Sequence, residues 1–475
     1  MSCGERPQVD RHAGPFLATD PIVSPARLPV FDKRRAGVLL HLSSLENALG
    51  RGGREFIDWV ADAGFSVWQF LPLGPTGTDG SPYWVRSDSA GNVAFLDQAE
   101  LPSFDGDEYR AFLASSKEWL DDYVVFEALS RDFHAAAWWD WPEEYRDREP
   151  GAVARICTDL APDIERMKRE QFAFAWQWAR LREHAHRRGV RLFGDLPFYV
   201  APDSAETWAN PKQFQLDGKG RATAVAGVPP DYFAEKGQLW GNPLYDWKAM
   251  RKDGFVFWRA RVARQLERVD VLRIDHFRAL AAHWCVPAGA PDARGGTWKR
   301  TPGRMCLTKL REEFGDLPII AEDLGVITPD VELLRTSFGL PGMRVLQFGF
   351  GGNPEDVHLP HMHSRDSIVY TGTHDNDTTL GWYLSLDSET LHRVNFFLRS
   401  GPGSMPEALV RAALGSVGGL AVIPMQDILG LGSEARLNMP GTVAGNWTWR
   451  LPAGALNADV ARHFAQLNRI YARSG

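Results

Sequence analysis

Eight short, nearly continuous apolar segments alternate with helical patterns along this chain of 475 residues. The segments lie at residues 37–41, 66–71, 190–195, 270–275, 318–322, 342–348, 367–373 and 420–426. Apolar runs of this length are typical of strands buried on both faces of a parallel sheet, joined by crossover helices. Eight such units predict a (β/α)8 barrel, and a doubly wound open sheet is the alternative that the same pattern allows.

Two connections are too long for simple loops, those at 72–189 and 196–269. Both leave the carboxyl ends of strands, where barrel enzymes build their sites, so we expect insertions that wall a cleft. A third insertion is expected at about 280–303, where a stretch rich in proline and glycine predicts a loop. We interpret residues 1–35 as a poorly ordered extension and 36–475 as one catalytic barrel, without a separate C-terminal β-sandwich domain.

The composition is that of a globular protein, with 44% apolar residues and a formal net charge of −7. This mild acidity gives no electrostatic reason to expect nucleic acid as a partner. No apolar run approaches the roughly 20 residues that span a bilayer, and the N-terminal stretch lacks the apolar centre of a secretory signal. The four cysteines (Cys3, Cys157, Cys285 and Cys306) show no C-x-x-C spacing and predict reduced thiols in a cytoplasmic protein.

Three of the expected strands end in carboxylates, at Asp275, Glu322 and Asp375. A charged residue directly after a buried strand is costly unless it faces the barrel mouth, so these three side chains should converge on one polar pocket. Retaining glycoside cleavage needs such a set: a carboxylate nucleophile and a carboxylic acid of raised pKa, about 5–5.5 Å apart. The 18 tryptophans also favour a sugar ligand, because flat aromatic rings stack on sugars.

Arg273 lies two residues before Asp275, so both side chains point to the same face of the strand, and the guanidinium can hold the carboxylate ionised. The alternative interpretation makes each carboxylate a helix N-cap or an ion-pair partner in a loop. The combination of three carboxylates with Arg273 and His374 favours the catalytic interpretation. No nucleotide-binding P-loop and no H-E-x-x-H zinc helix is present, so we predict neither a cofactor nor a metal.

These residues, together with several longer motifs elsewhere in the chain, resemble the 4-α-glucanotransferases, also called amylomaltases or disproportionating enzymes, of glycoside hydrolase family 77 in the α-amylase superfamily. The resemblance covers residues 35–451. The motifs are Leu-Pro-Leu-Gly-Pro-Thr-Gly at 71–77, Ser-Pro-Tyr at 81–83, Gly-Asp-Leu-Pro-Phe-Tyr-Val at 194–200, Ala-Gly-Val-Pro-Pro-Asp-Tyr-Phe at 226–233, Trp-Gly-Asn-Pro at 240–243, Glu-Ala-Arg at 434–436 and Gly-Asn-Trp at 445–447.

The resemblance implies that Asp275 is the nucleophile, Glu322 the general acid/base and Asp375 the group that grips donor hydroxyls. It further implies that Arg273 and His374 lie directly beside the reacting groups and support the reaction.

On the donor side, the resemblance implies that Tyr83 stacks on the sugar and that Asp195 completes the pocket floor. It places Tyr232, Phe233 and Trp240 on a loop over the acceptor side, although these three could also be hydrophobic anchors of that loop. The stretch 84–90 departs from the run that usually follows the tyrosine in the family. Smaller departures occur at Ala279 and at 299–303.

The implied substrates are maltooligosaccharides and α-1,4-glucans, and the implied reaction is transfer of a glucan segment to the 4-hydroxyl of an acceptor. A hydrolase or debranching enzyme with the same three carboxylates is one alternative. A catalytically silent glucan-binding protein is the other, and the intact carboxylate set argues against it. The sequence leaves the oligomeric state open.

Overall fold

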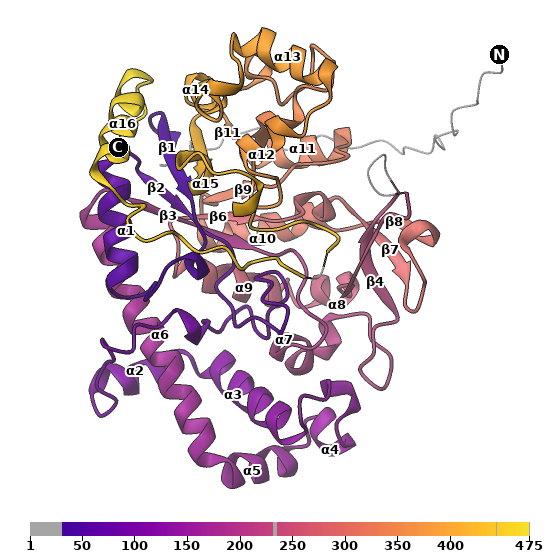
Figure 1. The fold of residues 1–475 in the computed structure, drawn as a ribbon. Coiled ribbons are helices and arrows are strands. Elements are labelled where there is room, and N and C mark those ends of the chain that lie inside the picture. Colours follow the sequence, from indigo (N-terminus) through magenta and orange to yellow (C-terminus); the bar gives the residue numbers. More distant parts are fainter. Residues whose placement is uncertain (1–30, 231–234, 443, 475) are drawn as a thin grey trace, which may run out of the picture.

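The computed structural model describes residues 31–230, 235–442 and 444–474 (Figure 1). Eight parallel strands follow the order β10-β11-β12-β1-β2-β3-β6-β9. Their bounds are β1 (Arg35–Leu39), β2 (Val67–Gln69), β3 (Arg191–Leu196), β6 (Val271–Ile274), β9 (Ile319–Ala321), β10 (Gly342–Val345), β11 (Ser367–Tyr370) and β12 (Leu420–Pro424). Each falls within or beside an expected segment. The N–H of Ala321 donates to the carbonyl of Pro341 at 2.9 Å and joins β9 to the start of β10. The predicted (β/α)8 barrel is confirmed.

The strands are apolar on both faces because each face is buried against a different core. Val67, Phe193 and Val271 belong to the cluster inside the barrel. Their chain neighbours, among them Trp68 and Leu272, belong to the larger cluster between the barrel and its helices. The period-2 alternation of a strand therefore distributes side chains between two apolar cores, which explains the continuous apolar runs in the sequence.

Helices surround the barrel. Those next to it are α1 (Arg51–Asp62), α6 (Ala161–Arg187), α9 (Val256–Leu266), α10 (Gly303–Phe314), α11 (Pro329–Ser337), α14 (Glu407–Gly415) and α16 (Ala458–Ile470). The connection between β10 and β11 departs from the pattern, because it holds two 3-10 turns, Leu346–Phe348 and Pro360–Met362, in place of an α-helix. At the C-terminal end the Nδ2 of Asn468 on α16 donates to the carbonyl of Ala63 at 3.0 Å, which fastens α16 beside α1.

The connection after β2 contains a helical unit, seen at the lower end of Figure 1, with an aromatic core of its own. Its helices are α2 (Asp107–Ser115), α3 (Lys117–Asp132), α4 (Glu143–Arg146) and α5 (Pro150–Asp159). The remaining helices lie in other connections: α7 (Ala205–Ala209), α8 (Trp247–Lys252), α12 (Thr379–Leu384), α13 (Ser388–Leu398) and α15 (Met425–Ile428). None of the helices in the described part of the chain is long and apolar enough to cross a membrane.

A second, antiparallel sheet of order β5-β4-β7-β8 lies at the side of the barrel (Figure 1). Its strands are β4 (Ala224–Val228), β5 (Gln238–Pro243), β7 (Ala282–Pro287) and β8 (Thr297–Arg300). The stretch 280–303, expected as a loop, therefore supplies two of these strands. The pattern did not reveal this sheet because β8 is exposed along its whole length and only the last two residues of β5 are buried, so neither gives the apolar signal of a buried strand.

Candidate active site

Asp275 and Glu322 stand on neighbouring strands at the carboxyl end of the barrel. β6 and β9 pair in parallel with Ile274 opposite Ala321, and each carboxylate follows directly. Adjacent strands lie about 4.7–4.9 Å apart, so the register alone brings these two side chains together. The backbone N–H of Glu322 also donates to the carbonyl of Ile274 at 3.0 Å, which extends the pairing to the site itself.

Arg273 joins two carboxylates from inside the barrel mouth. Its guanidinium donates to Asp275 Oδ1 and to Asp195 Oδ2, each at 2.6 Å, and the side chain is nearly buried. The hydroxyl of Tyr83 donates to the same Asp195 oxygen at 2.6 Å. Burial alone would lower the pKa of Arg273, but Asp195 and Asp275 raise it well above its ordinary value, so the guanidinium stays charged. The sequence had placed all four side chains in one pocket.

The two central carboxyl groups have different environments. Burial, followed by the charge of Asp275, raises the pKa of Glu322 to about 8. Burial also raises the pKa of Asp275, but Arg273 opposes that shift. Burial and the neighbouring Asp275 thus favour the protonated form of Glu322, whereas the guanidinium of Arg273 favours the ionised form of Asp275.

His276 turns the chain between the two carboxyl groups. Its φ of 48° lies in the left-handed region, which is uncommon for a residue with a side chain. In this conformation its backbone N–H donates to Glu322 Oε2 at 2.7 Å, while the N–H of Leu324 donates to Oε1 at 2.8 Å. Both oxygens of Glu322 are thus oriented by backbone, and the strain at His276 is located where it fixes a reactive group.

Asp375 lies on the loop after β11 and is more exposed than Asp275. Its Oδ1 accepts a hydrogen bond from Asn438 Nδ2 at 2.6 Å, and His374 Nε2 lies 3.3 Å from the same oxygen. The Tyr83 ring stacks on the His374 ring with centroids 5.2 Å apart, which connects this loop to the donor-side tyrosine. The indole of Trp447 flanks both rings at 6.1–6.2 Å.

Asn438 and Trp447 were not among the site residues predicted from the sequence. Trp447 belongs to the Gly-Asn-Trp motif at 445–447, so the resemblance could have indicated it. Nothing in the local pattern marks Asn438, because only the folding of the segment after β12 brings its amide to Asp375.

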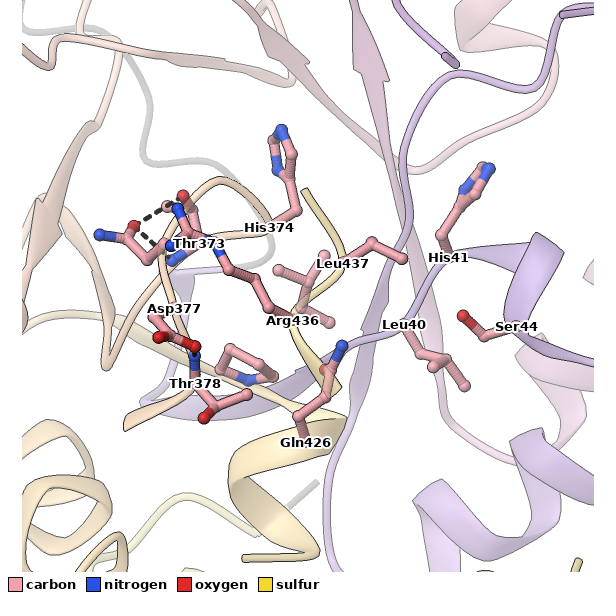
Figure 2. A pocket seen from close by; sticks show the side chains of 13 residues that line it. Leu40, His41, Ser44, Thr373, His374, Asp377, Thr378, Gln426, Arg436 and Leu437 are labelled. Carbon is pink, nitrogen blue, oxygen red and sulfur yellow. Dashed lines mark hydrogen bonds between the residues drawn. The ribbon is translucent and has the colours of Figure 1, made fainter. Parts of the chain in front are cut away.

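Behind this loop lies a small polar chamber of about 20 Å³. Figure 2 shows Thr373, His374 and Asp377 on one side and His41 and Ser44, which follow β1, on the other. The volume suffices for about one water molecule. Burial lowers the pKa of His41 to about 3, so this histidine is neutral and adds no charge beneath the site.

On the opposite side of the site, Trp240 on β5 meets His276 edge to face, with ring centroids 4.7 Å apart and an interplanar angle of 80°. Its indole Nε1 donates to Gln238 Oε1 at 3.1 Å. The structure therefore places this predicted acceptor-side residue beside the chain segment of Asp275. The other two predicted acceptor-side residues, Tyr232 and Phe233, lie outside the described residues.

A closed parallel barrel whose mouth holds an arginine-paired carboxylate beside a carboxyl group of raised pKa defines a class, the (β/α)8 enzymes that act on glycosidic bonds. The family model described as 4-alpha-glucanotransferase matches residues 40–108 and 98–456. The chain belongs to the 4-alpha-glucanotransferase family.

Similar proteins cover nearly the whole chain. The 4-alpha-glucanotransferase of Thermus thermophilus is 42% identical over 92% of this chain and 98% of that protein. The chloroplastic/amyloplastic 4-alpha-glucanotransferase of Solanum tuberosum is 40% identical over 94% of this chain and 87% of that protein. The structure of the amylomaltase from Streptococcus agalactiae in complex with acarbose superposes with a TM-score of 0.87, at 31% identity over 93% of this chain and all of that one.

Proposed function

We propose that this 4-α-glucanotransferase transfers α-1,4-glucan segments between maltooligosaccharides by double displacement through Asp275, Glu322 and Asp375. The observation that carries the proposal is that Asp275, paired with Arg273, and Glu322, whose pKa burial raises to about 8, stand at the ends of adjacent strands. This arrangement combines an ionised nucleophile with a proton donor, the two groups that a retaining mechanism requires.

In the first step a carboxylate oxygen of Asp275 attacks the anomeric carbon of the donor sugar. The bond from that carbon to the glycosidic oxygen breaks, and Glu322 gives its proton to the leaving oxygen. In the second step the now ionised Glu322 accepts the proton of an acceptor 4-hydroxyl. That oxygen attacks the anomeric carbon, and the ester bond to Asp275 breaks.

Asp375 would bind hydroxyl groups of the donor sugar and stabilise the positive charge of the oxocarbenium-like transition state. Its bond from Asn438 fixes the carboxylate while leaving nearly half of the side chain exposed for a ligand. Tyr83 would cover the donor sugar, since its ring is held between Asp195 and the face of His374. Trp240 would wall the acceptor side.

The covalent intermediate can react with water or with a sugar, and an ordered acceptor wall that excludes water favours the sugar. Trp240 beside His276 supports such a wall.

The predicted cytoplasmic location and the division into an extension (1–35) and a catalytic barrel (36–475) stay predictions. The location was predicted from the cysteine pattern.

The test uses pure maltotriose as the only substrate. The wild type should give glucose together with maltooligosaccharides longer than maltotriose, whereas hydrolysis would give only shorter sugars. Asp275→Asn should lower the rate by 10⁴-fold or more, roughly the effect of removing a catalytic nucleophile. It should still bind acarbose by calorimetry. The control, Asp132→Asn on the exposed end of α3, should match the wild type. Retained transfer in Asp275→Asn would refute the assignment.

A further inference from the structure

Arg278 lies in the 3-10 turn Phe277–Leu280, which follows directly on the end of β6. Its guanidinium Nη1 donates to the carbonyl oxygen of Val326 at 2.6 Å, and Val326 lies four residues after Glu322. In the described part of the chain, this is the one hydrogen bond that joins the stretch 324–327 to a segment outside the loop after β9. Arg278 therefore fastens the loop after β9 to the turn after β6.

The same two segments supply the backbone groups that hold Glu322. His276 donates its N–H to Glu322 Oε2 at 2.7 Å, and Leu324 donates its N–H to Oε1 at 2.8 Å. Each of these donors lies two residues before one partner of the bond between Arg278 and Val326. If the loop after β9 moved away from the turn, the two N–H groups would separate and the carboxyl group would lose its fixed orientation.

The guanidinium of Arg278 is itself held by an aromatic ring. Its Cζ lies 3.8 Å from the ring centroid of Trp298 on β8, well within the range of a cation–π contact. The Trp298 ring meets Trp284 of β7 edge to face, with centroids 5.2 Å apart. The hydroxyl of Thr301 donates to the carbonyl of Ala279 at 2.9 Å, which fastens the end of this hairpin to the turn that carries Arg278. The ring is thus fixed in place, although Trp298 is 40% exposed.

The contacts of Arg278 are those of a residue that fixes a loop. The side chain is buried, and within the described residues its Nε has no hydrogen-bond partner. Its one hydrogen bond there goes to a carbonyl oxygen and not to a carboxylate. Because Trp298 limits the rotation of the guanidinium, that bond has a fixed direction. Arg278 therefore acts on Glu322 through the backbone between them.

We propose that Arg278 is a positioning residue for the general acid/base: it holds the loop after β9 against the turn after β6, so that both oxygens of Glu322 keep their backbone donors. Trp298 holds Arg278 in place for this task. The inference rests on the proposed function. Because Arg278 acts through Glu322, its removal should slow the steps in which Glu322 transfers a proton and spare cleavage that needs no proton.

The experiment measures the first turnover, with enzyme in excess, on maltotriose and on α-maltotriosyl fluoride. Arg278→Met should slow the cleavage of maltotriose roughly 30-fold, a part of the 10²–10⁴-fold that general acid–base catalysis contributes. Fluoride leaves without a proton, so its release should stay within about threefold of wild type. The ratio of the two rates is the decisive quantity, because a merely structural role would lower both rates alike.

Three further variants test how the bond is held. Arg278→Lys keeps a cation over the ring and a donor for the carbonyl, and should restore part of the ratio. Trp298→Ala should lower the ratio in the same direction but less, while Trp298→Phe, which keeps a ring, should lie between Trp298→Ala and wild type. The matched control is Arg180→Met, which removes a guanidinium that lies over Trp176 on the outer helix α6 and should match the wild type on both donors.

The outcomes separate the two proposals. Glu322→Gln should lose maltotriose cleavage and keep the first-turnover release of fluoride; loss on neither donor, or equal loss on both, would refute Glu322 as the acid and this inference with it. If Glu322→Gln behaves as expected but Arg278→Met is unchanged, or loses equally on both donors, the inference alone fails. If Arg278→Met does not fold, Arg278→Lys and Trp298→Ala carry the same comparison.

Discussion

The proposed donor and acceptor halves of the site are built in different ways. Asp195 and Arg273 are 3% and 4% exposed, lie opposite each other on paired strands and share a hydrogen bond of 2.6 Å. The acceptor half is a hairpin outside the barrel, where Leu239 is 41% exposed and Trp240 rests edge-on against His276. One half is charged, buried and fixed by the sheet, whereas the other is aromatic, partly exposed and held by packing.

This difference assigns separate tasks to the two halves. Cleavage requires charged groups at defined positions, and strand ends supply rigid positions in a water-poor setting. The choice between sugar and water as acceptor depends on how well a wall is held in place. Changes in the donor half should therefore abolish the reaction, and changes in the acceptor half should redirect it.

The largest effect is expected from Arg273→Lys. A lysine ammonium keeps the charge but cannot bond Asp195 and Asp275 at once with the planar fork of a guanidinium. We expect a loss of about 10²–10³-fold in kcat on maltotriose, the scale of removing one preorganised electrostatic contact. The ratio of transfer to hydrolysis among the remaining products should not change.

The control is Arg180→Lys on α6, where the guanidinium lies over Trp176 on the outer surface. If kcat of Arg273→Lys falls by less than about threefold, the guanidinium fork is dispensable. A shift of one pKa unit at a catalytic carboxylate would alone change the population of its ionised form about tenfold.

The two halves also differ in how far the sequence could predict them. Asp275 and Glu322 follow their strands directly, so predicting the strands also predicted where the two carboxylates lie. Arg273 could be added because side chains two residues apart on a strand point to the same face. The β4–β5–β7–β8 sheet could not be found in this way. The pairing of β4 with β7 joins segments about 60 residues apart, for example Ala226 with Cys285, and β8 is exposed along its whole length.

Long-range contacts could not be predicted from the sequence for the same reason. The bond from Asn438 to Asp375 joins residues that no local pattern relates. The resemblance had identified the stretch 84–90 as unusual without showing what it touches. The position of a residue at a strand end can be predicted from its neighbours in sequence. The position of a residue in an insertion becomes known only from its neighbours in space.

An intermediate effect is expected from pH. Because Glu322 must be protonated to donate and its pKa is raised to about 8, cleavage of maltotriose should fall with rising pH above that value. The rate should decline about tenfold per pH unit once the acid is mostly ionised.

An α-maltotriosyl fluoride donor provides the control, because fluoride leaves without a proton. When its cleavage limits the rate, the alkaline decline should be absent. A decline of equal size with both donors would assign the titration to a group other than Glu322.

The smallest effect is expected within the insertions, at Glu206 on α7. Its Oε1 accepts hydrogen bonds from Ser87 Oγ at 2.7 Å and from the N–H of Asp88 at 3.0 Å, so it anchors the stretch that follows Trp84. Its side chain is buried, and Oε2 has no partner among the described residues. Burial, followed by the charge of Asp88, raises the pKa of Glu206 from 4.5 to about 7, although Arg261 pairs with Asp88 nearby.

A carboxyl group whose pKa is raised on folding stabilises the protein fully below its unfolded pKa. That contribution is lost as the pH rises through the folded pKa, here from 4.5 to about 7. Glu206→Gln cannot ionise and should not show this loss. From pH 5 to pH 8 the free energy of unfolding of the wild type should therefore fall relative to that of Glu206→Gln by roughly 1–3 kcal/mol.

Urea unfolding of both proteins at the two pH values measures this difference, and Glu183→Gln on the exposed face of α6 is the control. Arg268 lies near the same carboxyl group, and burial lowers its pKa to about 10, which is outside the range of the experiment. Equal pH dependence in wild type and Glu206→Gln would show that Glu206 is ionised throughout. In that case the insertion would be fixed by full charges, as the donor half is, and the contrast between the two halves would lie in their exposure alone.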